Sequence, residues 1–151
     1  MKELKISPDL HDTLLFEDLY TVRKLINIDI NKISAESITD MVMITCESST
    51  VDVIEKLQYL TSSINFNVDL DDVLGQTPLF HACLSNNYDV VKFILSFSPQ
   101  MYKSNNDGES PLTFATYRNK YPDNTIRALK ENDYDINRID DDGETFLTFV
   151  S

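Results

Sequence analysis

The chain has 151 residues, 42% of them hydrophobic, and contains two cysteines. This length suits a single domain that buries about 68–70% of its unfolded surface, and two cysteines are too few for the disulfide framework of a small secreted protein. Lys and Arg number 13 against 25 Asp and Glu, so the net charge is −12. That excess argues against DNA or RNA as a partner, because phosphates attract cations.

The three glycines of the chain mark a repeat. Gly75, Gly108 and Gly143 lie in the segments VLGQTPL, NDGESPL and DDGETFL, at spacings of 33 and 35 residues. Such a period is typical of stacked helix pairs joined by turns. Because glycine enters the positive-φ region without a Cβ penalty, each one is expected in a tight turn that precedes a helix.

The residues after each glycine predict where the helices begin. Thr77, Ser110 and Thr145 stand at expected N-cap positions, where a hydroxyl can accept a hydrogen bond from a free backbone N–H. Pro78 and Pro111 take the first helical position, at which a missing N–H has no cost. The sequence therefore predicts helices that start at these points.

The segment TPLFHA, residues 77–82, resembles the T-P-L-H-x-A pattern of the ankyrin repeat family, and SPLTFA, residues 110–115, is a second copy. The resemblance implies an all-α solenoid of about four helix-turn-helix repeats plus a short C-terminal half-repeat. The first copy departs from the pattern at Phe80, which holds the histidine position, with His81 one residue later. Asn87 replaces the usual loop glycine and tolerates left-handed geometry.

Aligned with this family, the chain divides into repeats from end to end. Taken in chain order, the predicted helix pairs span residues 8–28, 36–62, 77–97 and 110–131, with a turn or short helix from Thr145. A single domain, 1–151, would comprise an N-terminal capping repeat 1–35, a divergent repeat 36–71, repeats 72–104 and 105–139, and a C-terminal half-repeat 140–151. The first 35 residues could complete the stack or fold over it.

The C-terminal residues Phe146, Leu147, Phe149 and Val150 have no following repeat to cover them. They could tuck back onto the previous helix pair, or form an apolar patch open to a partner or a second copy. We expect tucking, and hence a monomer.

Catalytic chemistry has little support in the sequence. Cys46 and Cys83 occupy equivalent positions of two repeats and are expected to be reduced core thiols. The two histidines, His11 and His81, belong to helices two repeats apart, so a shared metal site is not expected. Cys83 and His81 could form a dyad only with difficulty, because residues two apart on a helix do not face each other. The isolated glycines form no phosphate cradle, so no cofactor is indicated.

Acidic residues gather at the turns: Asp69, Asp71 and Asp72 at one, Asp107 and Glu109 at the next, and Asp140, Asp141, Asp142 and Glu144 at the last. In stacked repeats these turns would line one edge of the groove with which ankyrin proteins generally bind other proteins. The positions that the resemblance maps to partner contact are Val73, Leu74, Gln76, Leu84, Ser85, Asn106, Asp107, Glu109, Tyr117, Arg118, Asp141, Asp142 and Glu144.

Some of these residues have a structural alternative. Asp72 and Asp140 are expected to bond the local backbone of their turns, whereas Glu109, Asp141, Asp142 and Glu144 are better candidates for binding. Leu84 and Tyr117 could anchor a partner or pack on a neighbouring helix.

The sequence thus favours a non-enzymatic protein that binds and inhibits a basic partner protein through an acidic concave and turn face. One alternative is a bacterial immunity protein that neutralises a basic toxin such as a nuclease, and another is a viral or pathogen protein that blocks a host factor. An enzyme using His81 and Cys83 is the remaining hypothesis. No run of 18 apolar residues is present, so a membrane partner is not expected. The expected location is the cytoplasm, either of the producing cell or of a host cell.

Overall fold

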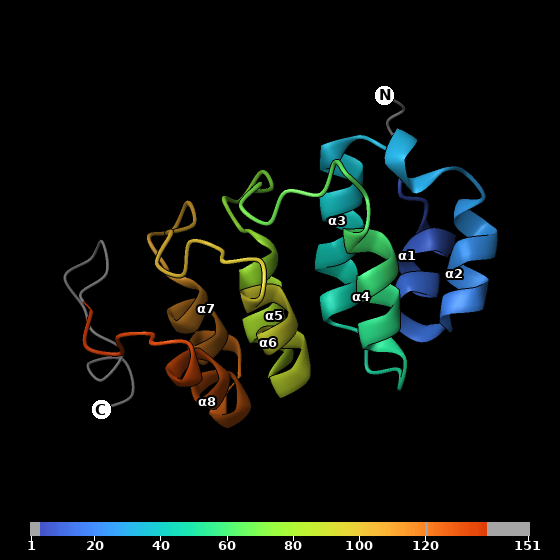
Figure 1. The fold of residues 1–151 in the computed structure, drawn as a ribbon. Coiled ribbons are helices and arrows are strands. Elements are labelled where there is room, and N and C mark those ends of the chain that lie inside the picture. The colour runs from blue at the N-terminus through green and yellow to red at the C-terminus, as the bar shows by residue number, and fades with distance from the viewer. Residues whose placement is uncertain (1–3, 120, 139–151) are drawn as a thin grey trace. The chain divides into compact units, whose positions relative to one another are not determined.

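The computed structural model describes residues 4–119 and 121–138, whose regular secondary structure consists of eight α-helices and one 3-10 helix (Figure 1). The helices confirm the predicted all-α class, and each predicted helix pair is present in the structure. The chain forms two compact units, residues 1–70 and 71–151. The predicted segment from Thr145, with Gly143 before it, lies outside the described residues.

The first unit contains α1 (Pro8–Phe16), α2 (Leu19–Ile26), η1 (Ile30–Lys32), α3 (Ala35–Cys46) and α4 (Val53–Thr61). Polar side chains begin its first three α-helices: Ser7, Asp18 and Ser34 each accept a hydrogen bond from a backbone N–H in the first turn. The core between the helices is formed by fully buried apolar side chains, among them Leu14, Val22, Ile38, Met41, Val42, Leu57 and Leu60.

The repeat period is visible in the hydrogen bonds of the first unit. Leu19 N–H donates to Asp52 Oδ2 at 2.7 Å, and Ser63 Oγ donates to the Ile30 carbonyl at 3.0 Å; each pair is 33 residues apart. Residues one repeat apart therefore lie beside each other in residues 4–70, although no glycine marks the period there. The family pattern is weakest here because these residues contain no glycine and no Thr-Pro-Leu segment to mark a turn.

The second unit contains α5 (Pro78–Ser85), α6 (Tyr88–Leu95), α7 (Pro111–Arg118) and α8 (Asp123–Glu131). The helices α5 and α7 pack through Phe80 and Phe114, whose ring centroids lie 5.5 Å apart in an edge-on arrangement. Thr125 Oγ1 of α8 donates to the Cys83 carbonyl of α5 at 2.8 Å. These contacts join the two helix pairs of the unit through apolar packing and a buried hydrogen bond.

Three local predictions are corrected or refined by the structure. The left-handed residue after α5 is Asn86, with φ of 51°, whereas Asn87 is extended and caps α6 through its side chain. Thr77 stands at the N-cap of α5 but its side chain makes no cap hydrogen bond there. Phe80, in the expected histidine position, is fully buried and fills the core.

Candidate functional site

The turn before α5 is held by its own backbone and by one carboxylate. Asp72 N–H donates to the Gln76 carbonyl at 2.9 Å, and Gly75 N–H donates to the Asp72 carbonyl at 3.0 Å. Asp72 Oδ1 accepts from the N–H groups of Leu74 and Gln76 at 2.9 and 3.0 Å. Asp72 therefore has the structural role expected of it, because its side chain closes the turn.

The same turn recurs before α7, with Asn105 in the place of Asp72. Asn105 Oδ1 accepts from the N–H groups of Asp107 and Glu109, both at 3.0 Å, and Gly108 N–H donates to the Asn105 carbonyl at 3.0 Å. Gly75 and Gly108 both have φ of 78°, as predicted for glycine in these turns.

The two turns lie directly against each other. Asn106 donates from its backbone N–H to the Leu74 carbonyl and from Nδ2 to the Val73 carbonyl, both at 2.9 Å. The contact is so close that a Cβ atom on Gly75 would lie 2.7 Å from Asn106 Oδ1. The segments around residues 75 and 108 thus form one continuous ledge, while Gly143 lies outside the described residues.

Two apolar side chains project from this ledge. Val73 is 91% exposed and Leu74 is 57% exposed, although both sit on a backbone that is fixed by hydrogen bonds on each side. Because the backbone is already fixed, these side chains can bury surface against a partner without the cost of ordering the turn that carries them.

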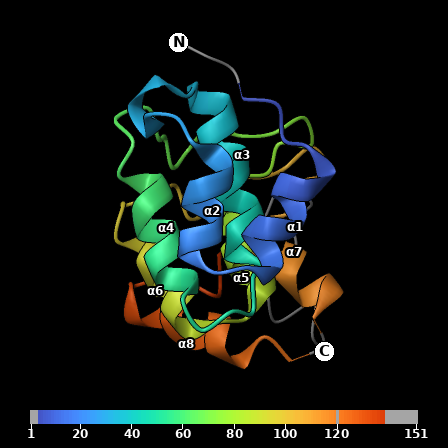
Figure 2. The ribbon, with the colours of Figure 1, turned by 90° about the vertical axis from the view of Figure 1, so that its right-hand side faces the viewer.

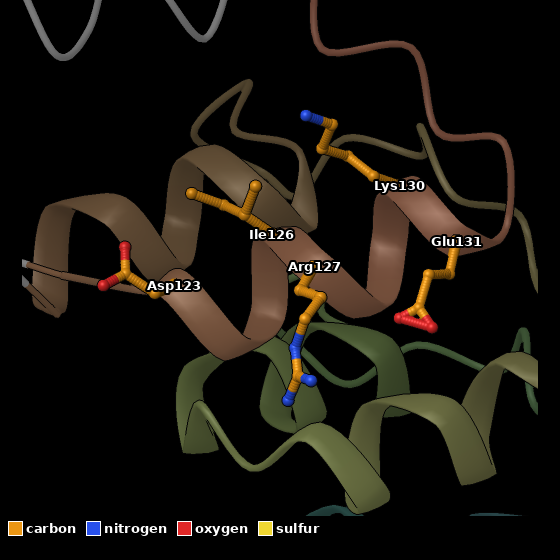
Figure 3. Close-up of a pocket in the computed structure, with 5 residues that line it drawn as sticks. All are labelled: Asp123, Ile126, Arg127, Lys130 and Glu131. Carbon is orange, nitrogen blue, oxygen red and sulfur yellow. The ribbon is translucent and has the colours of Figure 1, made fainter.

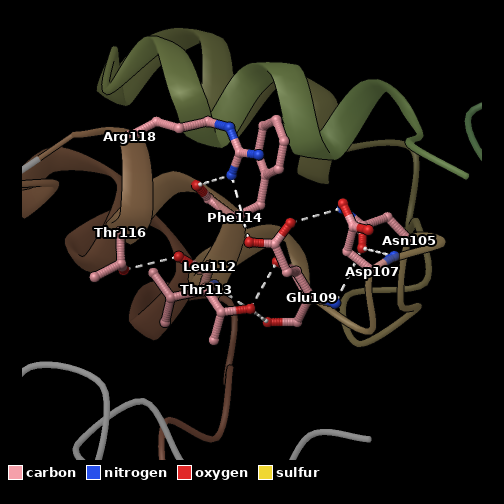
Figure 4. A network of polar contacts seen from close by, with 9 residues as sticks. Asn105, Asp107, Glu109, Leu112, Thr113, Phe114, Thr116 and Arg118 are labelled. Atoms are coloured by element: carbon pink, nitrogen blue, oxygen red, sulfur yellow. Dashed lines mark hydrogen bonds and ion pairs between the residues drawn. The ribbon is translucent and has the colours of Figure 1, made fainter. Parts of the chain in front are cut away.

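A polar network links the ledge to α7 (Figure 4). Glu109 Oε1 accepts from Asn105 Nδ2 at 3.1 Å, and Glu109 Oε2 lies 3.4 Å from Arg118 Nη1. Arg118 also donates to the Phe114 carbonyl at 3.0 Å, and its guanidinium lies 3.8 Å from the centre of the Phe114 ring. Glu109, with only 12% of its side chain exposed, therefore acts mainly within the repeat and offers little carboxylate surface to a partner.

The remaining predicted contact residues differ widely in exposure. Tyr117 is 61% exposed on α7, and Asp107 and Asn106 are exposed on the ledge. Leu84 and Ser85 are half-buried at the end of α5, and Gln76 is only 7% exposed, so its side chain presents almost no surface. Asp140, Asp141, Asp142 and Glu144 lie outside the described residues.

The surroundings of Cys83 and His81 oppose nucleophilic chemistry by this pair. Cys83 is fully buried, and burial raises the pKa of its thiol, which disfavours the thiolate that a nucleophile requires. His81 Nε2 faces the turn before α5, 3.8 Å from Asp72 Oδ2, and not the Cys83 thiol. Cys46 and Cys83 are both buried and outside any disulfide, as predicted for core thiols.

An open cavity of about 390 Å³ lies along α8, lined by Asp123, Ile126, Arg127, Lys130 and Glu131 (Figure 3). Arg127 lies over the Tyr88 ring, 4.0 Å from its centre, and the Tyr88 hydroxyl donates to Glu131 Oε1 at 2.6 Å. Lys130 points away from the side that Arg127 takes, so the two cations do not converge on one point. This cluster was not among the predicted site residues; its signal in the sequence is the spacing of Arg127 and Glu131, four residues apart on α8.

In residues 4–119 and 121–138, no group of three or more His, Cys, Asp and Glu is placed to hold a metal ion. None of the helices described has both the length and the apolar character needed to cross a membrane.

Comparisons with known proteins match these features. Residues 10–103 match the family model for ankyrin repeats, in three copies. The ANK repeat-containing protein nipk-1 of Caenorhabditis elegans is 38% identical over 85 residues, which cover 54% of this chain and 13% of that protein.

A solved complex of a predatory endopeptidase from Bdellovibrio bacteriovorus with an immunity protein contains a chain that aligns with a TM-score of 0.58 and 26% identity. The alignment covers 72% of this chain and 54% of that chain. The present chain thus spans a small part of the nematode relative and about half of the matched structural chain.

Proposed function

We propose that this chain, which belongs to the ankyrin-repeat family, is a non-enzymatic protein that binds and inhibits a partner protein. Its partner docks on a surface that we call the turn face, formed by Val73, Leu74, Asn106, Asp107 and Tyr117. Ankyrin repeats are in general protein-interaction modules. Our proposal concerns the surface that this chain uses and the chemistry of its partner.

The observation that carries the proposal is the exposure of Val73 and Leu74 on a fixed backbone. Apolar side chains of this size are ordinarily buried, and full burial of one contributes about 1.5–3 kcal/mol. Here both project from the turn before α5, which Asn106 of the next turn holds through two hydrogen bonds. Tyr117, next to Arg118 in the network that reaches Glu109, adds an exposed aromatic anchor of the type common in binding hot spots.

Charge favours a basic partner. Asp107 is exposed on the ledge, and the exposed Asp71, next to Asp72 in the chain, pairs with Lys103 at 3.2 Å. Together with the net charge of −12, such carboxylates speed association with a cationic surface and make it sensitive to salt.

The test is capture of the partner from the native source at low and high salt, followed by affinity measurement on the purified pair. The double variant Val73→Ser/Leu74→Ser should bind at least about tenfold more weakly, and Tyr117→Ser should also lose affinity. Ile64→Ser is the matched control, because Ile64 is 81% exposed and belongs to the first unit, whereas the turn face lies in the second. Equal affinity of the double variant and the control would refute the turn face.

A second candidate is favoured by the structural match. The aligned complex contains an immunity protein bound to an endopeptidase, so an immunity protein that neutralises a toxic partner is a specific form of the same inhibitory function. The acidic charge points to a basic toxin, either a nuclease or a peptidase. Co-expression with the product of a neighbouring gene tests this form: protection from toxicity supports it, and unabated toxicity removes it. A viral or pathogen protein that blocks a host factor would instead yield a host protein in the capture experiment.

A further inference from the structure

Three large apolar or aromatic side chains are exposed where α1 ends, where α2 begins and in the α3–α4 loop of the first unit. Phe16 is the last residue of α1 and is 67% exposed. Tyr20 is the second residue of α2 and is 72% exposed, and Val51 in the α3–α4 loop is fully exposed. Single exposed apolar residues are normal in soluble proteins. Three on adjacent loops form a patch, which is a feature of interaction sites.

The two loops are fastened to each other. Ser48 Oγ donates to the Leu15 carbonyl at 2.6 Å, and Leu19 N–H donates to Asp52 Oδ2 at 2.7 Å. Each of these bonds involves a residue next to an exposed one: Leu15 is next to Phe16, Leu19 to Tyr20 and Asp52 to Val51. The three exposed side chains therefore belong to segments that contact each other directly. Figure 2 shows the α1–α2 and α3–α4 loops at the same, lower end of their helices.

A buried lysine holds this end of the unit rigid. The Lys56 side chain is completely buried, and its Nζ donates to the carbonyls of Leu14 and Glu17 and to Ser48 Oγ, at 2.8, 2.9 and 3.0 Å. An ammonium has three donors, and all three have acceptors here. Burial lowers the pKa of Lys56, and the nearby Asp52 carboxylate opposes that effect. The backbone before and after Phe16 is thus anchored to a buried group, while the Phe16 side chain is exposed.

The segments that carry the patch are mostly acidic. Segments 9–26 and 47–56 carry seven carboxylates and three Lys or Arg side chains, namely the buried Lys56 and Arg23 and Lys24 on α2; the carboxylates are Asp9, Asp12, Glu17, Asp18, Glu47, Asp52 and Glu55. His11 lies beside Asp12, with 3.7 Å between Nδ1 and Oδ1. A second copy of this chain would bring the same carboxylates together and be repelled, and a nucleic acid would be repelled for the same reason.

We propose that Phe16, Tyr20 and Val51, with their rim of carboxylates, form a second docking surface that binds a basic amphipathic segment of a partner protein. We call it the loop face. Its apolar side chains cover the apolar side of the segment, and the carboxylates pair with lysine and arginine side chains at its borders. The loop face lies wholly within residues 4–70 and shares no residue with the turn face, so either surface can fail its test while the other stands.

The experiment uses the full chain, isotopically labelled, and a short synthetic peptide of leucine and lysine that forms an amphipathic helix. Amide shifts in the NMR spectrum locate the bound peptide, and titrations give its affinity. Phe16→Ser/Val51→Ser should weaken binding by about tenfold or more. Ile64→Ser is the control from the same unit, since Ile64 is also exposed, at 81%. Phe16→Leu keeps an apolar side chain and should keep most of the affinity.

Shifts at residues 15–20 and 48–52, with weaker binding by the double variant alone, would support the proposal, as would loss of affinity at high salt. Binding that is equal in the double variant and in Ile64→Ser would overturn it. Shifts confined to other parts of the chain, or the absence of binding, would do the same. The spectrum of each variant also reports whether the chain is folded, and substitution of side chains this exposed should leave the fold intact.

Discussion

The tightest contact in the turn face makes a quantitative prediction for Gly75→Ala. A methyl group on Gly75 would lie 2.7 Å from Asn106 Oδ1 and 2.9 Å from Asn106 N, and the residue has φ of 78°. An L-residue in left-handed geometry costs about 1–2 kcal/mol. Separation of the two turns would also weaken the hydrogen bonds from Asn106 to Leu74 and Val73, each worth about 0.5–1.5 kcal/mol. The second unit should therefore lose roughly 2–5 kcal/mol of stability.

The assay is urea unfolding followed through amide signals of α5 and α7, performed as a double-mutant cycle with Asn106→Ala. Removal of Asn106 Oδ1 eliminates the closest clash but leaves the backbone contact and the positive φ. Gly75→Ala should thus cost about 1 kcal/mol less in the Asn106→Ala background. A cost below about 1 kcal/mol in the wild-type background, or the same cost in both backgrounds, would refute the account of the stacked turns.

Three further predictions concern buried groups. Lys56→Met keeps the side-chain volume but leaves the carbonyls of Leu14 and Glu17 without their donor, so urea unfolding should show a loss of about 1–3 kcal/mol in the first unit; undiminished stability would contradict the role given to the ammonium. Burial raises the pKa of Tyr134 from 10.0 to about 12. Between these values the unfolded chain has lost the phenolic proton and the folded chain retains it, so stability should fall as the pH rises from about 10 to about 12, by up to about 2–3 kcal/mol. Tyr134→Phe should remove that slope, and an unchanged slope would show that other groups cause it. Cys83 should react with a thiol reagent far more slowly in the folded chain than in urea, and rapid labelling of the folded chain would revive the enzyme hypothesis.

The repeat period and helix starts of residues 71–138 could be predicted because they depend on local backbone chemistry. Gly75 and Gly108 occupy a conformation that other residues avoid, and Pro78 and Pro111 are pre-shaped for a helix start. These constraints act within a few residues, so they are visible in the sequence.

The side-chain roles could not be predicted in the same way. Glu109 was expected to face a partner, yet it pairs with Arg118, a residue on the next helix. Lys56 is an ordinary lysine by sequence, and its burial depends on the Leu14 carbonyl 42 residues away. Such roles follow from side-chain contacts along a helix or between repeats, which the local pattern does not encode.

The turn face itself is the central claim, and hydrogen exchange on the captured complex tests it most directly. Residues 72–76 and 105–109 should exchange more slowly when the partner is bound, because their exposed edge is covered. Slower exchange in these turns, lost with Val73→Ser/Leu74→Ser, is the predicted result. Unchanged exchange at both turns in a complex that is otherwise stable would contradict the claim.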